Sequence, residues 1–171
     1  MIVYSGRTGM PKCLALFLLS MLIAIPASAA GWRSYDNDRF GYHVELPPDF
    51  RVTAEAQNGD GLTLGSGDGS AQLLVFGSHI LDGDFADEVQ QRMEFARQDG
   101  WVLSYSSVKP AGASFSGTRG DRILYLRAVA LCEAAAGFLQ IDYPARDRKR
   151  FDAVVARLVK SLRPRAVCPS R

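Results

Sequence analysis

The fold of this chain is decided by residues 101–133, WVLSYSSVKPAGASFSGTRGDRILYLRAVALCE. Within them, segments 101–108, 113–117 and 122–133 have the β-branched and aromatic residues typical of strands, and turn-rich spacers separate them. Strands joined by such short connections must run antiparallel, because a parallel return needs a long crossover. This stretch therefore predicts an antiparallel sheet.

Further strands are expected on both sides of this stretch. Alternating or extended segments with turn-forming flanks occur at 42–46, 50–56, 61–65, 71–77 and 136–144. The cluster of Gly, Ser and Asp at 66–69 predicts a hairpin between the segments 61–65 and 71–77. Residues 32–41, in contrast, mix aromatic residues with turn formers. We expect an antiparallel sheet of about six to seven strands.

Two segments, 84–98 and 147–162, show the periodicity of amphipathic helices. Asp84 can cap the first helix, and Pro164 ends the second. Their buried faces are expected at Phe85, Val89, Met93 and Ala96, and at Phe151, Val154, Val155, Leu158, Val159 and Leu162. An antiparallel sheet with two main helices packed on it is an α+β fold.

The first residues have the features of a secretory signal peptide. Arg7 and Lys12 precede an apolar run at 13–25, and the small-residue motif Ala-Ser-Ala ends at Ala29. The run is shorter than the about 20 residues of a membrane-spanning helix, so a retained anchor is the weaker alternative. We expect residues 1–29 to be a signal peptide cleaved after Ala29. The product is then a periplasmic or secreted single domain, residues 30–171.

Charge argues against nucleic acid as a partner. The chain has 20 Lys and Arg residues against 18 Asp and Glu residues. Removal of the signal peptide, which contains Arg7 and Lys12, leaves 18 basic and 18 acidic residues. Binding to nucleic acid depends on concentrated positive charge, which a neutral product lacks.

Cys132 and Cys168 remain after cleavage. In an oxidising compartment an even pair predicts a disulfide, which would hold the C-terminal tail to the sheet. It would close a loop of about 36 residues and stabilise the fold by roughly 3–4 kcal/mol in the chain-entropy model. Two free thiols are the alternative. Neither a CxxC spacing nor a nearby histidine favours a metal or redox pair.

Several short motifs resemble one pattern. They are Tyr35-Asp36-Asn37, Arg39-Phe40-Gly41-Tyr42, Leu46-Pro47-Pro48-Asp49-Phe50, Asn58-Gly59-Asp60-Gly61, Asp68-Gly69, Ile141-Asp142-Tyr143-Pro144 and Ser161-Leu162-Arg163-Pro164. The pattern resembles a group of small exported bacterial proteins whose opening is similar to that of the PsbP/Mog1-like α/β/α sandwiches. The resemblance covers most of residues 32–164. It implies a central antiparallel sheet between helices, and a binding or assembly role with no established reaction. The photosystem and nuclear-transport roles of that superfamily do not carry over, because their functional residues are not matched one by one.

The glycine-rich residues 58–70, NGDGLTLGSGDGS, invite comparison with ligand loops. A P-loop needs a lysine near its end, and none occurs between Lys12 and Lys109. A dinucleotide loop leads into a helix, whereas a strand-like segment follows here. An EF-type calcium loop needs more acidic ligands than Asp60 and Asp68 provide. We interpret the glycines as turn formers and expect no cofactor.

Catalytic candidates are few. Of the two histidines, His43 and His79, the second is followed by Asp82 and Asp84. These residues could form a base–carboxylate pair or hold a metal ion weakly, which makes a small hydrolase or metal-dependent site the alternative function. We favour a helix cap at Asp84 and a turn at Asp82. The sequence has no GxSxG, HExxH or CxxC motif, and we assign no catalytic or metal-binding residue.

Arg146, Arg148, Lys149 and Arg150 form the densest basic run, at the start of the second predicted helix. The N-terminal end of a helix is unfavourable for cations, so this run is a candidate interaction surface for an anionic partner. A solvated helix face is the alternative. Aromatic residues gather at 32–42, and Trp101 and Tyr105 lie on a predicted strand. Several of them on one open face would form a recognition surface.

These observations favour a non-catalytic exported domain that binds another protein or a component of the cell envelope. The alternatives are the small hydrolase around His79 and a structural envelope protein without a small ligand. An enzyme should bring the candidate side chains together in a concave pocket. A binding domain should instead show an exposed apolar or aromatic patch.

Overall fold

The structure, a computed structural model, describes residues 1–3 and 31–166. Nearly all of the predicted signal peptide, and Cys168 of the predicted disulfide, lie outside the described residues. Among the residues that the structure describes, no helix has the length and apolar character needed to cross a membrane.

An antiparallel seven-stranded sheet forms the centre of the fold. Its strands are β3 (Phe50–Glu55), β4 (Gly61–Ser66), β5 (Gln72–His79), β6 (Val102–Lys109), β7 (Gly112–Arg119), β8 (Arg122–Leu131) and β9 (Ala135–Pro144). They lie in the order β3-β4-β5-β9-β8-β7-β6, and every adjacent pair is antiparallel. The predicted α+β class and the number of strands in this sheet are confirmed.

A second, three-stranded sheet goes beyond the sequence prediction. β1 (Arg33–Asn37) pairs with β2 (Tyr42–Leu46), and the short β10 (Arg163–Pro164) pairs with the other side of β2. The interpretation of residues 32–41 as aromatics among turns misses β1. Arg33, Ser34 and Asp36 face solvent, so the strand depends on its backbone pairing with β2 and lacks the apolar alternation that predicts one.

The predicted helices are present within one residue of their expected ends, as α1 (Phe85–Gln98) and α2 (Arg148–Ser161). A short 3-10 turn, Ala145–Asp147, leads into α2. All four residues expected on the buried face of α1 are buried. Of the six residues expected to be buried on the second helix, three are buried: Phe151, Leu158 and Leu162. The other three are half-buried: Val154, Val155 and Val159.

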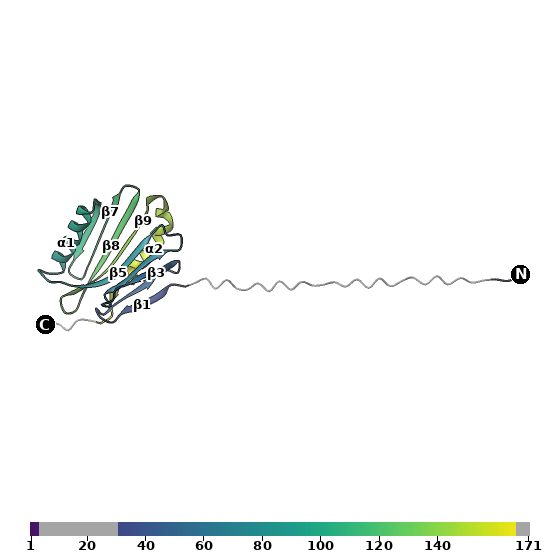
Figure 1. Cartoon of the computed structure of the whole chain (residues 1–171), viewed down its shortest axis with the longest axis horizontal. Helices are drawn as coiled ribbons and strands as arrows, with labels where there is room; N and C mark the ends of the chain where they lie inside the picture. The colour runs from purple at the N-terminus through teal and green to yellow at the C-terminus, as the bar shows by residue number, and fades with distance from the viewer. Residues whose placement is uncertain (4–30, 167–171) are drawn as a thin grey trace.

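The two helices pack on opposite faces of the large sheet, because alternate residues of each strand point to opposite sides. α2 and the three-stranded sheet share one core, which includes Tyr42, Ile141 and Phe151. α1 forms the other core, which includes Val89 and Phe138. Figure 1 shows α1 beside β7 and α2 behind the strands. The layers form an α/β/α sandwich-like arrangement.

The glycine-rich residues 58–70 form the turns on both sides of β4, as predicted. Gly59 (φ 76°) lies between β3 and β4, and Gly69 (φ 69°) lies between β4 and β5. Both adopt the left-handed conformation that glycine tolerates best. Gly77 has a different role, because a Cβ there would come within 2.2 Å of the Phe40 ring. Its missing side chain lets the β1–β2 connection pack directly on β5.

Candidate functional site

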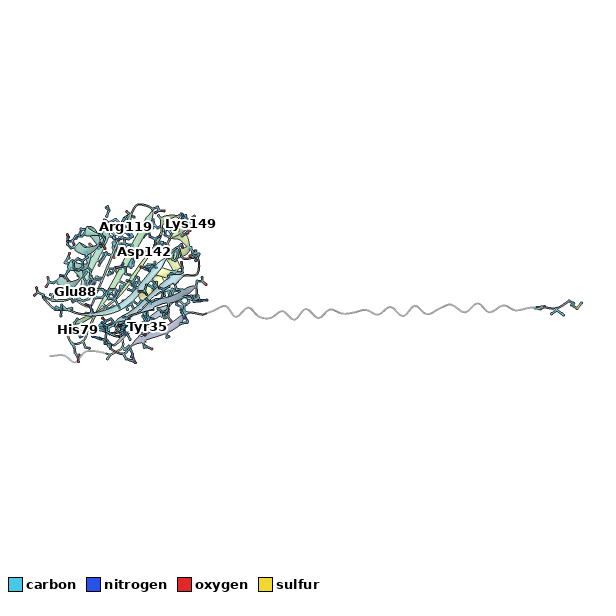
Figure 2. All side chains as sticks on the ribbon, in the orientation of Figure 1. Tyr35, His79, Glu88, Arg119, Asp142 and Lys149 are labelled. Carbon is cyan, nitrogen blue, oxygen red and sulfur yellow. The ribbon has the colours of Figure 1, made fainter. Side chains whose placement is uncertain are left out.

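A pocket of about 330 Å³ lies where β5 ends and α1 begins. Its lining residues include the sequence candidates His79 and Asp82 but not Asp84, and are Ser78, His79, Leu81, Asp82, Asp87, Glu88, Gln91 and Arg92. Figure 2 shows His79 and Glu88 at this end of the molecule. The turns at 58–70 contribute no lining residue. The structure therefore brings His79 and carboxylates to one pocket, without the glycine-rich stretch.

The carboxylates of Asp84, Asp87 and Glu88 at the start of α1 are engaged in structural contacts. Asp84 Oδ1 accepts a hydrogen bond from the backbone N–H of Asp87 at 3.1 Å. Asp87 Oδ2 accepts one from the backbone N–H of Asp84 at 2.9 Å, which completes a capping box. Glu88, only 7% exposed, forms an ion pair of 2.7 Å with Arg92. The Arg92 guanidinium also lies 5.0 Å from the centre of the Phe138 ring. The predicted cap at Asp84 is confirmed.

His79 has a ring contact in place of an ionic partner. Its imidazole packs on Phe40, with ring centroids 5.0 Å apart. In the described part of the chain, no hydrogen bond or ion pair joins His79 to a carboxylate. Nor do the described residues include a group of His, Cys, Asp and Glu side chains that could hold a metal ion. The geometry therefore gives His79 no carboxylate to orient it as a base.

The other histidine, His43, contacts Asp36, its direct partner in the β1–β2 ladder, through Nδ1 at 2.8 Å. This hydrogen bond lowers the pKa of the Asp36 carboxyl below its ordinary value. Arg165 lies on the same carboxylate at 3.6 Å. The contact thus belongs to a group of ion pairs that ties the three-stranded sheet together.

The four basic residues of the predicted interaction surface lie in different surroundings. Arg150 reaches the β4–β5 turn, where its Nη1 donates a hydrogen bond to Asp68 Oδ2 at 2.6 Å. Arg148 lines a separate groove beside α2. Arg146 and Lys149 are exposed, and Figure 2 shows Lys149 far from the pocket at the start of α1. The use of these four residues as one interaction surface stays a prediction.

The groove beside α2 has a volume of about 320 Å³ and lies between this helix and the outer strands of the sheet. Its lining residues are Ser104, Ser116, Gly117, Thr118, Ile123, Tyr125, Tyr143, Arg148, Asp152 and Val155. Burial raises the pKa of the Tyr143 hydroxyl above its ordinary value. α2 packs on β8, β9 and β2, so the outer strands β6 and β7 extend beyond it.

The strand register aligns side chains of these outer strands in two rows. Tyr105 of β6 lies opposite Ser116 of β7, which lies opposite Tyr125 of β8. Val102, Thr118 and Ile123 form the second row in the same way. Directly paired residues project to the same face, here the face of α2. With Ser104, we call these residues the open strip: Val102, Ser104, Tyr105, Ser116, Thr118, Ile123 and Tyr125.

A β-bulge between Leu103 and Tyr105 brings Val102 and Tyr105 to the same face. Strict alternation would direct two residues three positions apart to opposite faces. Both side chains are well exposed, Val102 at 70% and Tyr105 at 51%. Among the described residues, the hydroxyls of Ser116 and Tyr125 make no hydrogen bond. The open strip thus combines exposed apolar groups with unengaged hydroxyls.

Among the described strands, β6 pairs only with β7, so it is an edge strand of the large sheet. Residues 102–108, VLSYSSV, carry no charge, and Lys109 follows at the end of the strand. The opposite edge, β3, carries Arg51 and Glu55. Charged residues on an edge strand oppose pairing with another chain, and most of β6 lacks this protection.

The aromatic residues that were candidates for a recognition surface differ in their exposure. Trp101 is only 7% exposed and lies beneath the Arg119 guanidinium, 4.5 Å from the ring centroid. The aromatic residues of segment 32–42 pack into or against the core of α2. Tyr105 remains exposed. Tyr105 is predictable as an aromatic residue on a strand. Val102 was not predicted, although the uncharged run that contains both residues is a detectable signal.

Comparisons with protein-family models and with curated protein sequences find no match. Among solved structures, the chain is similar to cyanobacterial PsbP (CyanoP) from Synechocystis sp. PCC 6803. The TM-score is 0.63 at 10% identity, over 81% of this chain and 95% of that one. It is also similar to the Saccharomyces cerevisiae Ran-binding protein Mog1p, with a TM-score of 0.56 at 7% identity, over 80% and 96% of the two chains. Identities this low establish the fold alone. The chain has a PsbP/Mog1-like fold, as its short motifs predict.

Proposed function

We propose that this protein is an exported, non-catalytic domain that binds a protein partner through the open strip. One observation carries the proposal: Val102 and Tyr105 are exposed side chains on an edge strand without charge over residues 102–108. Tyrosine is enriched in protein interfaces, whereas charged residues are depleted from their centres. A strand edge also offers unpaired backbone groups to a partner.

Two further observations support the proposal. One of the similar structures is a Ran-binding protein, so this fold serves protein recognition in at least one case. Export is supported by the leader features of residues 1–29. The alternative, a hydrolase using His79 with Asp82 or Asp84, has less support, because Asp84 caps α1 and, among the described residues, no hydrogen bond or ion pair joins His79 to Asp82.

A photo-crosslinking amino acid in place of Tyr105 tests the proposal in cells that produce the full chain. We expect a defined crosslinked product, because an exposed side chain at the centre of an interface lies against the partner. The matched control is Val52 on the opposite edge strand, which is exposed to a similar extent, 46%. The same amino acid at Val52 should give no such product.

The purified partner then provides a quantitative measurement. We expect Tyr105→Lys to weaken its binding by at least about tenfold, as substitution of a central interface residue does. The melting temperature of the variant should match that of the wild type. Failure to crosslink at Tyr105, or equal binding by Tyr105→Lys, would contradict the proposed function.

A further inference from the structure

The regular part of the β6 edge is short. β6 pairs with β7 without interruption from Tyr105 to Lys109, beyond the bulge that follows Leu103. A bulge disrupts the ladder, so an added strand can pair most regularly with the part after it. The centre of this part is Ser107.

An uncharged edge strand favours pairing with another uncharged strand, and β6 is itself uncharged over residues 102–108. Its residues 102–108 contain neither Pro nor Gly and include β-branched and aromatic residues that favour strands. Residues 30–171 carry equal numbers of basic and acidic residues, so long-range repulsion between two copies is small. We infer that the partner of the β6 edge is a second copy of this chain, paired antiparallel through β6. The inference rests on the proposed function and names its partner.

The pairing has a defined register. An antiparallel pair centred on Ser107 places this residue opposite its own counterpart on a twofold axis. Tyr105 then lies opposite Lys109 of the partner subunit, and the same contact occurs twice. Tyr105 and Lys109 share one face of the strand, because side chains alternate. Each contact sets an ammonium group against an aromatic ring and keeps the two lysines apart.

Such a dimer joins the two large sheets into one continuous sheet. The strand pairing alone buries less than the about 1,600 Å² of a standard interface. We therefore expect a weak dimer that dissociates in the micromolar range, and the experiments use protein concentrations on both sides of it.

Cross-linking tests the register. In the protein purified after expression of the full chain, Ser107→Cys should give a covalent dimer with a short bismaleimide. Ser106→Cys is the matched control, because this register sets it opposite Val108 of the partner subunit. It should therefore give several-fold less dimer. The wild type under the same conditions measures the contribution of the native cysteines.

Sedimentation equilibrium tests the interface itself. The wild type should show a reversible monomer–dimer equilibrium. Tyr105→Lys should raise its dissociation constant at least tenfold, because two lysines then face each other at both ends of the pairing. Val52→Lys, on the opposite edge, should leave the equilibrium unchanged.

The outcomes separate the two proposals. A wild type that stays monomeric at hundreds of micromolar, or a dimer unaffected by Tyr105→Lys, overturns the second-copy inference. If photo-crosslinking at Tyr105 then captures a different polypeptide, the proposed function stands and only the identity of the partner is wrong. If Tyr105 captures nothing and the chain is monomeric, both fail.

Discussion

At the scale of single residues, Asp68 connects the β4–β5 turn to α2. Its Oδ1 accepts a hydrogen bond from Ser66 Oγ at 2.6 Å and another from Ser70 Oγ at 2.8 Å. Its Oδ2 accepts the hydrogen bond from Arg150. The hydrogen bond from Ser66, followed by that from Arg150, holds the pKa of the Asp68 carboxyl well below its ordinary value of 3.8.

Asp68→Asn should lower the melting temperature at neutral pH, because the amide loses the charge that these donors stabilise. Folding depresses this pKa, so the contribution is complete above the ordinary value and is lost as the pH falls towards the folded one. Calorimetry of wild type and variant should show a constant difference at neutral pH that shrinks below about pH 4. Exposed Asp82→Asn is the control. A difference that persists undiminished in acid would contradict this account.

At the scale of elements, α1 begins at the capping box between Asp84 and Asp87. Asp84→Ala removes the acceptor for the backbone N–H groups of Ala86 and Asp87. We expect the free energy of unfolding to fall by about 1 kcal/mol, the usual cost of alanine at this position. Urea denaturation measures the change, and Asp84→Ser should retain most of the stability. Equal stability of the alanine and serine variants would show that the cap contributes little.

Only some of the strands can be predicted from the sequence. β5 and β8 alternate buried and partly exposed residues, so their character is visible locally. β1 and β10 become strands because β2 lies between them, and they come from opposite ends of the described domain. β1 pairs with the neighbouring β2 but lacks apolar alternation, and β10 pairs with β2 across a long separation in sequence, so neither strand has a local pattern that predicts it.

At the scale of the whole molecule, the predicted disulfide would connect the C-terminal tail to the β8–β9 end of the sheet. Cys132 and Ala166 line one pocket of about 220 Å³, and Cys168 is two positions beyond Ala166 in the sequence. The described residues therefore bring the chain near Cys132 shortly before Cys168.

We expect the chain that the proposed export would release, residues 30–171, to contain no titratable thiol until it is reduced. Reduction should lower the free energy of unfolding by roughly 3–4 kcal/mol, because the unfolded chain regains the freedom of an open loop. Thiol titration and denaturation with and without reductant measure both effects. The double variant Cys132→Ser and Cys168→Ser should not respond to reductant. Two thiols in the unreduced protein would favour the free-thiol alternative.

The candidate site was predictable only in part. Tyr105 stood out as an aromatic residue on a strand, but Trp101, four positions earlier, proved buried. Ser116 and Ile123 carry no local signal of function. They join Tyr105 because the register of β6, β7 and β8 sets all three on the face of α2.

The sequence by itself determined the helices, most strands of the large sheet, the turns and the capping residue, because periodicity, propensity and turn chemistry act between neighbours in the chain. Only the tertiary structure decided that β9 lies between β5 and β8, which leaves β6 at the edge of the sheet. It also decided that α2 leaves the outer strands open. Both outcomes depend on contacts between residues far apart in the sequence, which no local pattern records.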